Sequence, residues 1–162
     1  MRTDNWPPRW LTDVPDEAIE RGKDQEPVVP FIDQFGIITK DSVAGKAGEK
    51  MVLRHWQEKI LDRVFAWDED GLRHRISLVG MPRKSGKSAL GSAIALYSLI
   101  LGPKGGEVYS VAAEKQQARI VFADAKRMVE SSEQLSAITN LYRDAIEFKA
   151  LGSVYRDRKS VV

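Results

Sequence analysis

The chain has 162 residues and a formal net charge of +2, with 43% hydrophobic and 30% charged residues. This length suits one buried core, and the composition is that of a globular protein, which excludes a fibrous or disordered chain. The absence of cysteine excludes disulfides and thiolate metal sites. The N-terminus lacks a signal-peptide core and the apolar run 89–101 is too short to span a bilayer, so we expect a soluble, cytoplasmic protein without membrane contact.

Residues 1–40 are predicted to form an N-terminal arm. Five of the seven prolines lie within its first 30 residues, so we expect a mostly extended segment with at most one short helix near residues 16–21. Its acidic side chains outnumber its basic ones, which leaves the positive excess on the rest of the chain. Trp6 and Trp10 are costly to leave in water, and we expect them to pack on the body of the protein or, alternatively, against another subunit.

An amphipathic helix is predicted for residues 55–67, where Trp56, Ile60, Val64 and Trp67 recur at three- and four-residue steps. A strand, a loop and a second helix follow. Residues 76–79 form a short apolar run typical of a strand, and the apolar run 89–101 ends at a Gly-Pro pair that stops a helix.

The loop between this strand and helix ends Gly-Lys-Ser, as does the phosphate-binding pattern G-x-x-x-x-G-K-[ST]. Gly86 lets the backbone approach a phosphate, Lys87 reaches the β- and γ-phosphates, and the Ser88 hydroxyl is a ligand for Mg²⁺. The helix dipole adds partial positive charge at the same point. Met81 stands where the pattern has its first glycine. The alternative is a basic turn that binds nothing.

Downstream, the pattern predicts a strand over residues 107–113, a helix over 116–130, a short helix over 134–142 and a β-hairpin around Ile146 and Tyr155. A strand–helix–strand unit with a right-handed crossover places its two strands in parallel in one sheet. The fold class is therefore α/β.

Hydrolysis of ATP also requires an acidic residue at the tip of an apolar strand, to help hold Mg²⁺. Two runs end in an acid. Glu114 follows the predicted strand 107–113, and Asp124 follows residues 120–123, although the helical period there places Asp124 on a helix surface. Neither is a strong candidate, so the nucleotide site looks half present.

Taken together, these segments resemble the large subunit of tailed-phage terminases, the ATP-driven motors that push DNA into capsids. The similarity runs from about Val29 to Arg156. Its most specific part is residues 81–88, which look like the family's altered Walker A loop, without the first glycine and with basic residues in the middle. Residues 29–33, 52–57, 111–118 and 152–156 are similar to other segments of the same domain.

This resemblance implies a partial P-loop NTPase domain over residues 41–162, with a parallel sheet flanked by helices. ATP and Mg²⁺ are the implied cofactors. Gln57 is the position that contacts adenine in the family, Ser88 is the metal ligand, and Lys87 and Arg83 are the implied catalytic residues. The implied nucleotide-binding residues are Gln57, Pro82, Arg83, Lys84, Ser85, Gly86, Lys87 and Ser88.

The resemblance also implies partners: double-stranded DNA, the terminase small subunit, the portal protein and further copies of the chain, in the cytoplasm of a bacterial host. A basic face of Lys115, Arg119, Lys126 and Arg127 could contact DNA, although such faces are commonly only solvated. The family's later acidic strand and nuclease domain have no counterpart here, so we expect a truncated terminase that does not hydrolyse ATP alone. Two alternatives are a non-catalytic remnant that binds other proteins and a small-molecule P-loop kinase.

Overall fold

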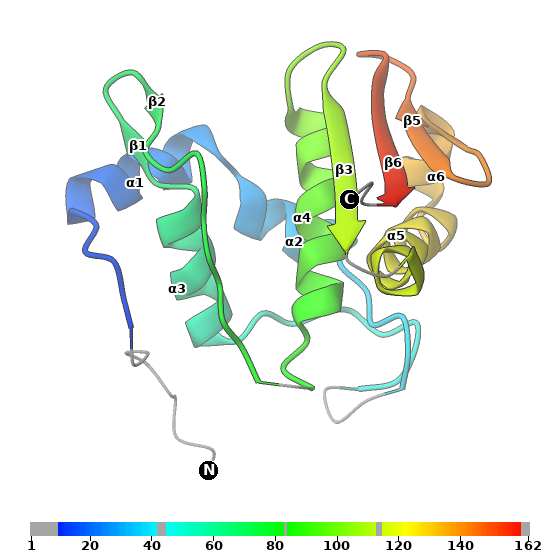
Figure 1. The fold of residues 1–162 in the computed structure, drawn as a ribbon, viewed down its shortest axis with the longest axis horizontal. Coiled ribbons are helices and arrows are strands. Elements are labelled where there is room, and N and C mark those ends of the chain that lie inside the picture. The colour runs from blue at the N-terminus through cyan, green and yellow to red at the C-terminus, as the bar shows by residue number, and fades with distance from the viewer. Residues whose placement is uncertain (1–9, 42–44, 83, 113–114, 160–162) are drawn as a thin grey trace. The chain divides into compact units, whose positions relative to one another are not determined.

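Figure 1 shows the computed structural model of the chain, which describes residues 10–41, 45–82, 84–112 and 115–159. These residues form a mixed α/β structure, which confirms the predicted class. The elements in chain order are α1 (Asp16–Gln25), α2 (Val28–Phe35), α3 (His55–Val64), β1 (Trp67–Asp68), β2 (Gly71–Leu72), α4 (Lys87–Leu101), β3 (Glu107–Ala112), α5 (Lys115–Glu130), α6 (Glu133–Ile138), β4 (Thr139–Leu141), β5 (Ala145–Phe148) and β6 (Ser153–Lys159).

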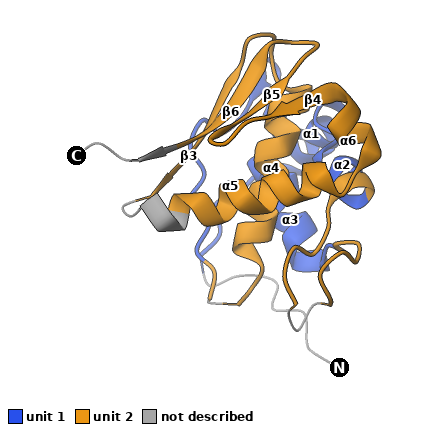
Figure 2. Ribbon diagram, turned by 90° about the vertical axis from the view of Figure 1, so that its right-hand side faces the viewer, with its two compact units in different colours: residues 1–33, 52–80 blue, residues 34–51, 81–162 orange. Residues whose placement is uncertain are grey.

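The chain divides into two compact units, coloured separately in Figure 2. The first unit comprises residues 1–33 and 52–80, and the second comprises residues 34–51 and 81–162. Among the described residues, no helix is both long enough and apolar enough to cross a membrane.

In the first unit, helix α1 packs against α3 and the β1–β2 hairpin. Gly22 on α1 permits a close approach, because a Cβ at this position would lie 2.3 Å from the carbonyl oxygen of Phe65. A larger residue at this position would push α1 away from the end of α3. The core cluster of this contact consists of Val14, Ala18, Ile19 and Ala66.

The segment predicted to be a mostly extended arm contains two helices in its described part, α1 and α2. Val28, Phe31 and Ile32 occupy one buried face of α2, and burial of such a stripe stabilises a helix. Pro30 is tolerated because it lies in the first turn, where its missing N–H has no partner to lose. Helix α1 contains the short helix predicted near residues 16–21, whereas the extended conformation predicted for residues 28–35 is wrong because they form α2. The division into an arm over 1–40 and a domain over 41–162 stays a prediction.

Of the two tryptophans in that arm, only Trp10 is among the described residues. Trp6 lies outside the described residues. Trp10 is 81% exposed, so the burial expected from packing on the body is largely absent, and the alternative of a contact with another subunit stays a prediction.

The second unit contains a four-stranded sheet in the order β3-β6-β5-β4. Strands β3 and β6 are parallel, whereas β5 is antiparallel to both β4 and β6. The predicted hairpin is confirmed, with Ile146 opposite Tyr155. The helix predicted over residues 134–142 is only partly present, because α6 ends at Ile138 and the chain then enters β4.

Helices α4 and α5 both pack against this sheet, and Figure 2 shows α5 crossing α4 beneath it. Tyr155 of β6 is fully buried at this contact. Its ring meets Phe122 of α5 edge-on, with ring centroids 5.2 Å apart, and its hydroxyl is hydrogen-bonded to the Ser110 hydroxyl of β3. One side chain thus links two strands and a helix.

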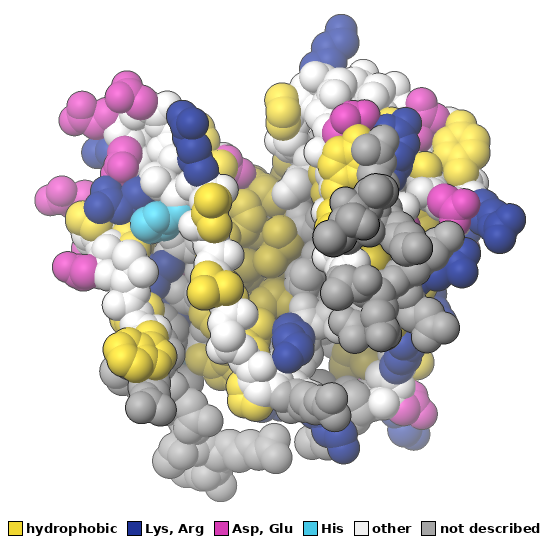
Figure 3. Space-filling model, in the orientation of Figure 1, with side chains coloured by type: hydrophobic (Ala, Val, Ile, Leu, Met, Phe, Trp, Pro, Cys, Tyr) yellow, Lys and Arg dark blue, Asp and Glu magenta, His cyan; other side chains and the backbone are white. Residues whose placement is uncertain are grey.

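The strand predicted for residues 76–79 is absent. Ile76 is 89% exposed and Leu78 is 100% exposed, and exposed apolar side chains are visible on the face drawn in Figure 3. A strand requires a neighbour that pairs with its N–H and C=O groups. No strand in the described part of the chain pairs with these residues, and β3 has β6 as its parallel partner instead.

We predict that Tyr155 makes stability fall at alkaline pH. Burial raises the pKa of the Tyr155 hydroxyl, the charge of Asp157 adds to this rise, and the hydrogen bond with Ser110 opposes it. Because the folded pKa lies above the unfolded value of about 10, the contribution to stability is complete below that pH and is lost as pH rises through the folded pKa.

Urea unfolding measured from about pH 9 to 11 should therefore show a steeper loss of stability in the wild type than in Tyr155→Phe, which cannot ionise. Parallel curves for the two proteins would contradict the prediction.

Candidate functional site

The predicted phosphate loop ends where helix α4 begins. Gly86 is the N-cap residue, and its φ of +82° lies in the left-handed region that glycine tolerates without strain. It supplies no capping side chain, and the first turn of an α-helix leaves N–H groups without partners inside the helix. The first turn also carries no acidic residue. These features suit an anion at this helix end.

Two hydrogen bonds fold the loop back over the start of α4. The Ser85 hydroxyl donates to the carbonyl oxygen of Pro82 at 2.7 Å, and the Lys87 ammonium donates to the carbonyl oxygen of Met81 at 3.1 Å. Lys87, which the motif predicts to bind phosphates, is thus held across the loop by its hydrogen bond to the Met81 carbonyl oxygen.

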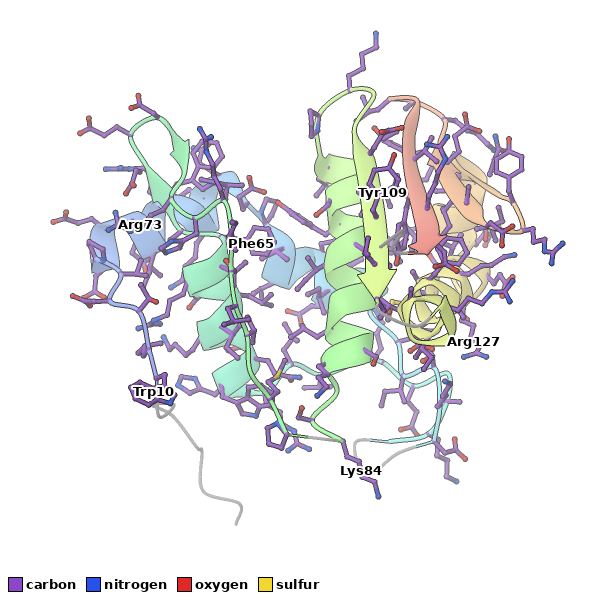
Figure 4. The ribbon with its side chains drawn as sticks, in the orientation of Figure 1. Trp10, Phe65, Arg73, Lys84, Tyr109 and Arg127 are labelled. Atoms are coloured by element: carbon purple, nitrogen blue, oxygen red, sulfur yellow. The ribbon has the colours of Figure 1, made fainter. Side chains whose placement is uncertain are left out.

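The middle of the loop carries two cations in the sequence. Arg83 lies outside the described residues. Lys84 has a φ of +64°, which is uncommon for a residue with a Cβ, and Figure 4 shows its side chain pointing away from the ribbon at the foot of α4. Backbone strain of this kind at a loop is one mark of a binding site.

Ser88 lies in the first turn of α4, and its carbonyl oxygen accepts a hydrogen bond from the Ser92 hydroxyl at 2.7 Å. Within the described ranges, no group of three His, Asp or Glu side chains lies together, so a metal site formed by protein side chains alone is not found there. Mg²⁺ commonly binds through one or two protein ligands, several waters and substrate phosphates. A single serine hydroxyl beside a phosphate cradle fits that mode of binding.

Gln57 belongs to the first unit, whereas residues 81–88 belong to the second. Its side chain is buried, and its Oε1 accepts the backbone N–H of Arg54 at 2.9 Å. This bond closes the N-terminus of α3, as in a capping box. The predicted contact with adenine is not tested by this arrangement and stays a prediction.

Asp124, one of the two candidate acids, does not stand at the tip of a strand. Glu114 lies outside the described residues. Asp124 lies on α5, as its helical period indicated, but it is buried rather than on the surface. Its carboxylate accepts hydrogen bonds from the Thr39 hydroxyl at 2.8 Å and from Arg127 at 3.1 Å. Asp124 therefore connects the segment of residues 36–41 to α5 through its hydrogen bond with Thr39.

The cations predicted to form a basic face on α5 have partners within the protein. Arg119 lies 3.7 Å from a carboxylate oxygen of Asp144, Lys126 donates to the carbonyl oxygen of Tyr142 at 3.1 Å, and Arg127 pairs with Asp124. Figure 4 labels Arg127 beside α5. The side chain of Lys115 is outside the described set. Because these three cations already have partners, less of the positive charge on α5 is available to bind DNA phosphates.

A separate cavity of about 410 Å³ lies in the first unit between α1, α2 and α3. None of the predicted site residues lines it.

The family model for "Terminase large subunit, ATPase domain" matches residues 55–156. The chain belongs to this family. The match covers the phosphate loop, α4, β3 and α5, so the family assigned from the sequence is confirmed.

The terminase fold is also found among solved structures. The chain is similar to the crystal structure of the HK97 bacteriophage large terminase, with a TM-score of 0.71 and 22% sequence identity over 85% of this chain. The chain spans only 28% of the length of that protein. Comparison with curated proteins finds no match.

The sequence pattern identified the loop and its helix, but it missed the polar bonds around them. Ser92 and Thr39 bind carbonyl and carboxylate oxygens on distant segments. The local signal for Ser92 is weak, since it is one of two serines in the mostly apolar run 89–101, and Thr39 has no local signal.

We predict that Gly86→Ala lowers stability by about 1 kcal/mol, because a Cβ in the left-handed region clashes with the backbone. Gly80→Ala is the matched control. Gly80 precedes the loop, has no left-handed φ and has open space around its Cα, so its substitution should change stability by less than about 0.5 kcal/mol. Urea midpoints of the two variants would measure the difference, and equal midpoints would contradict the conformation of Gly86.

Proposed function

We propose that this chain is an ATP-binding part of a phage terminase large subunit and that residues 82–88 hold the nucleotide phosphates. The observation that carries the proposal is the Gly-Lys-Ser turn at the start of α4, in a chain whose family is the terminase ATPase domain. Backbone N–H groups at a helix start, one left-handed glycine and one lysine form a cradle for phosphate oxygens.

In this proposal each residue has one task. Lys87 exchanges its bond to the Met81 carbonyl oxygen for the β- and γ-phosphates. Gly86 lets the backbone approach them, while Pro82, Lys84 and Ser85 shape the loop. Arg83 would stabilise charge on the transferred phosphoryl group, and Gln57 would contact adenine.

Ser88 would hold Mg²⁺ together with phosphate oxygens and water. When bound, the metal neutralises charge on the phosphates. The protein's own contribution at this point is the position of the Ser88 hydroxyl on the first turn of α4.

The wider role we propose is ATP-driven packaging of viral DNA, in the cytoplasm of a bacterial host. Membership of the terminase large subunit ATPase family supports this role, as does the likeness of the chain to a bacteriophage large terminase. Double-stranded DNA, the small subunit, the portal protein and further copies of the chain are the proposed partners. A complete motor also requires an acidic strand residue and a nuclease, and within the described residues no group of three His, Asp or Glu side chains lies together.

We predict that Lys87→Ala weakens binding of Mg·ATP by about 10- to 100-fold, because a hydrogen bond to a charged group is worth roughly 1.5–3 kcal/mol. Isothermal titration calorimetry of the chain would measure this. Lys104→Ala, which removes an exposed lysine from the turn between α4 and β3, should leave the affinity unchanged. Equal affinities for the wild type and Lys87→Ala would remove the site assignment.

We also predict that the chain binds double-stranded DNA with an affinity that falls steeply with salt. Three phosphate contacts would lower the affinity roughly 40-fold between 50 and 200 mM salt, through release of counterions. Fluorescence anisotropy with a labelled duplex would measure the slope. Absent binding, or binding that does not respond to salt, would show that this part of the terminase does not contact DNA phosphates.

A further inference from the structure

A buried hydroxyl joins the phosphate-loop helix to the next helix. Ser92 lies on α4 and is fully buried. Its Oγ lies 2.7 Å from the carbonyl oxygen of Ser88 in the first turn of α4 and 2.8 Å from the carbonyl oxygen of Val121 on α5. Because a serine hydroxyl has one proton, the two carbonyl oxygens share it.

Packing alone does not require a serine at this position. The other buried residues of α4 are Leu90, Ala93, Ala95, Leu96, Tyr97 and Leu99. A buried hydroxyl is costly unless it is hydrogen-bonded, and alanine would fill nearly the same volume. The neighbouring position is Gly91, where a Cβ would make only an ordinary contact with Val121 at 3.8 Å, so α5 lies close to α4 here without a clash. What the hydroxyl adds is the bond between the two helices.

The first turn of α4 is also the turn that carries Ser88. We propose that Ser92 is a positioning residue: it fixes this turn against α5, so that the Ser88 hydroxyl is oriented for Mg²⁺ and metal binding is transmitted to α5. This inference rests on the proposed function, because it assumes that Ser88 binds the metal of Mg·ATP.

Helix α5 is connected to the rest of the second unit close to this bond. Phe122, next to Val121, packs against Tyr155 of β6. Asp124, one turn further on, holds Thr39 at 2.8 Å. A displacement of α5 at Val121 would therefore shift the contact of α5 with the sheet and its hydrogen bond with residues 36–41.

The test compares ATP affinity with Mg²⁺ and with EDTA, measured by calorimetry on the full chain. Ser92→Ala keeps the Ser88 hydroxyl and Lys87, so affinity in EDTA should match the wild type within twofold. The gain in affinity on adding Mg²⁺ should fall about tenfold, the lower end of what residues behind a metal ligand contribute. Ser92→Cys keeps more of the side-chain volume with only a weak donor, and should behave like Ser92→Ala.

Ser136→Ala, at an exposed position on α6, is the control for the loss of a serine hydroxyl bond to α5. The Ser136 hydroxyl donates to the carbonyl oxygen of Val129 at 2.8 Å, so this variant also removes a hydroxyl bond to α5, but at the opposite end of that helix. Its Mg²⁺-dependent gain should equal that of the wild type. An equal loss in Ser92→Ala and Ser136→Ala would mean that both bonds only stabilise the fold, which would overturn the positioning role.

Hydrogen exchange supplies a second readout. Mg·ATP should slow exchange across residues 118–130 in the wild type and in Ser136→Ala but not in Ser92→Ala. Without nucleotide, Ser92→Ala should speed exchange of the amides at residues 90–92, which donate to the carbonyl oxygens of the first turn of α4, and unchanged exchange there would overturn the inference whatever the chain binds. If the wild type binds no Mg·ATP, the proposed function itself fails. If it binds and Ser92→Ala keeps the full Mg²⁺-dependent gain, only the role of Ser92 fails.

Discussion

The left-handed turn at Gly86 is the constraint on which the rest of the site depends. It lets α4 start at Lys87 without a capping side chain, so that the N–H groups of the first turn stay available. Lys87 then reaches back to the Met81 carbonyl oxygen across the loop. The remainder of α4 is apolar and packs against α5 and the sheet. The start of the helix is therefore anchored through the buried residues that follow it.

Polar bonds inside the second unit decide how its parts meet. Asp124 joins α5 to Thr39, the Ser92 hydroxyl joins α4 to α5, and Tyr155 joins β6 to β3 through Ser110. Each of these groups would cost stability if it were buried without its partner. Apolar packing tolerates small sliding movements, whereas these bonds favour one register of each helix. The terminase fold thus uses a few buried polar groups to orient elements that hydrophobic contacts only bring together.

The apolar segment before the loop shows the limit of pattern reading. Residues 76–79 have the composition of a strand, yet Ile76 and Leu78 are exposed and no described strand pairs with them. Residues of this type favour an extended backbone, but a β-strand also needs the edge of a neighbouring strand with which its N–H and C=O groups can form hydrogen bonds. This chain spans 28% of the HK97 large terminase to which it is similar. Strand β3 instead takes β6 as its parallel partner, across an intervening helix pair and hairpin.

The sequence by itself determined helices α4 and α5, strand β3, the β5–β6 hairpin and helix α3 as far as Val64, although it extended that helix to Trp67, which lies in β1. It also determined the Gly-Lys-Ser pattern before α4, whose role in phosphate binding stays a prediction. These features depend on the spacing of residues that are close in the chain, and the same spacing was enough to assign the terminase family. Only the tertiary structure decided that Gln57 caps its own helix, that Asp124 is buried against Thr39 and that Ser92 bridges two helices. For Asp124 and Ser92 the reason is that burial and bonding depend on which distant segments meet. For Gln57 the reason is that the same glutamine can cap a helix or face solvent, and its surroundings select between the two.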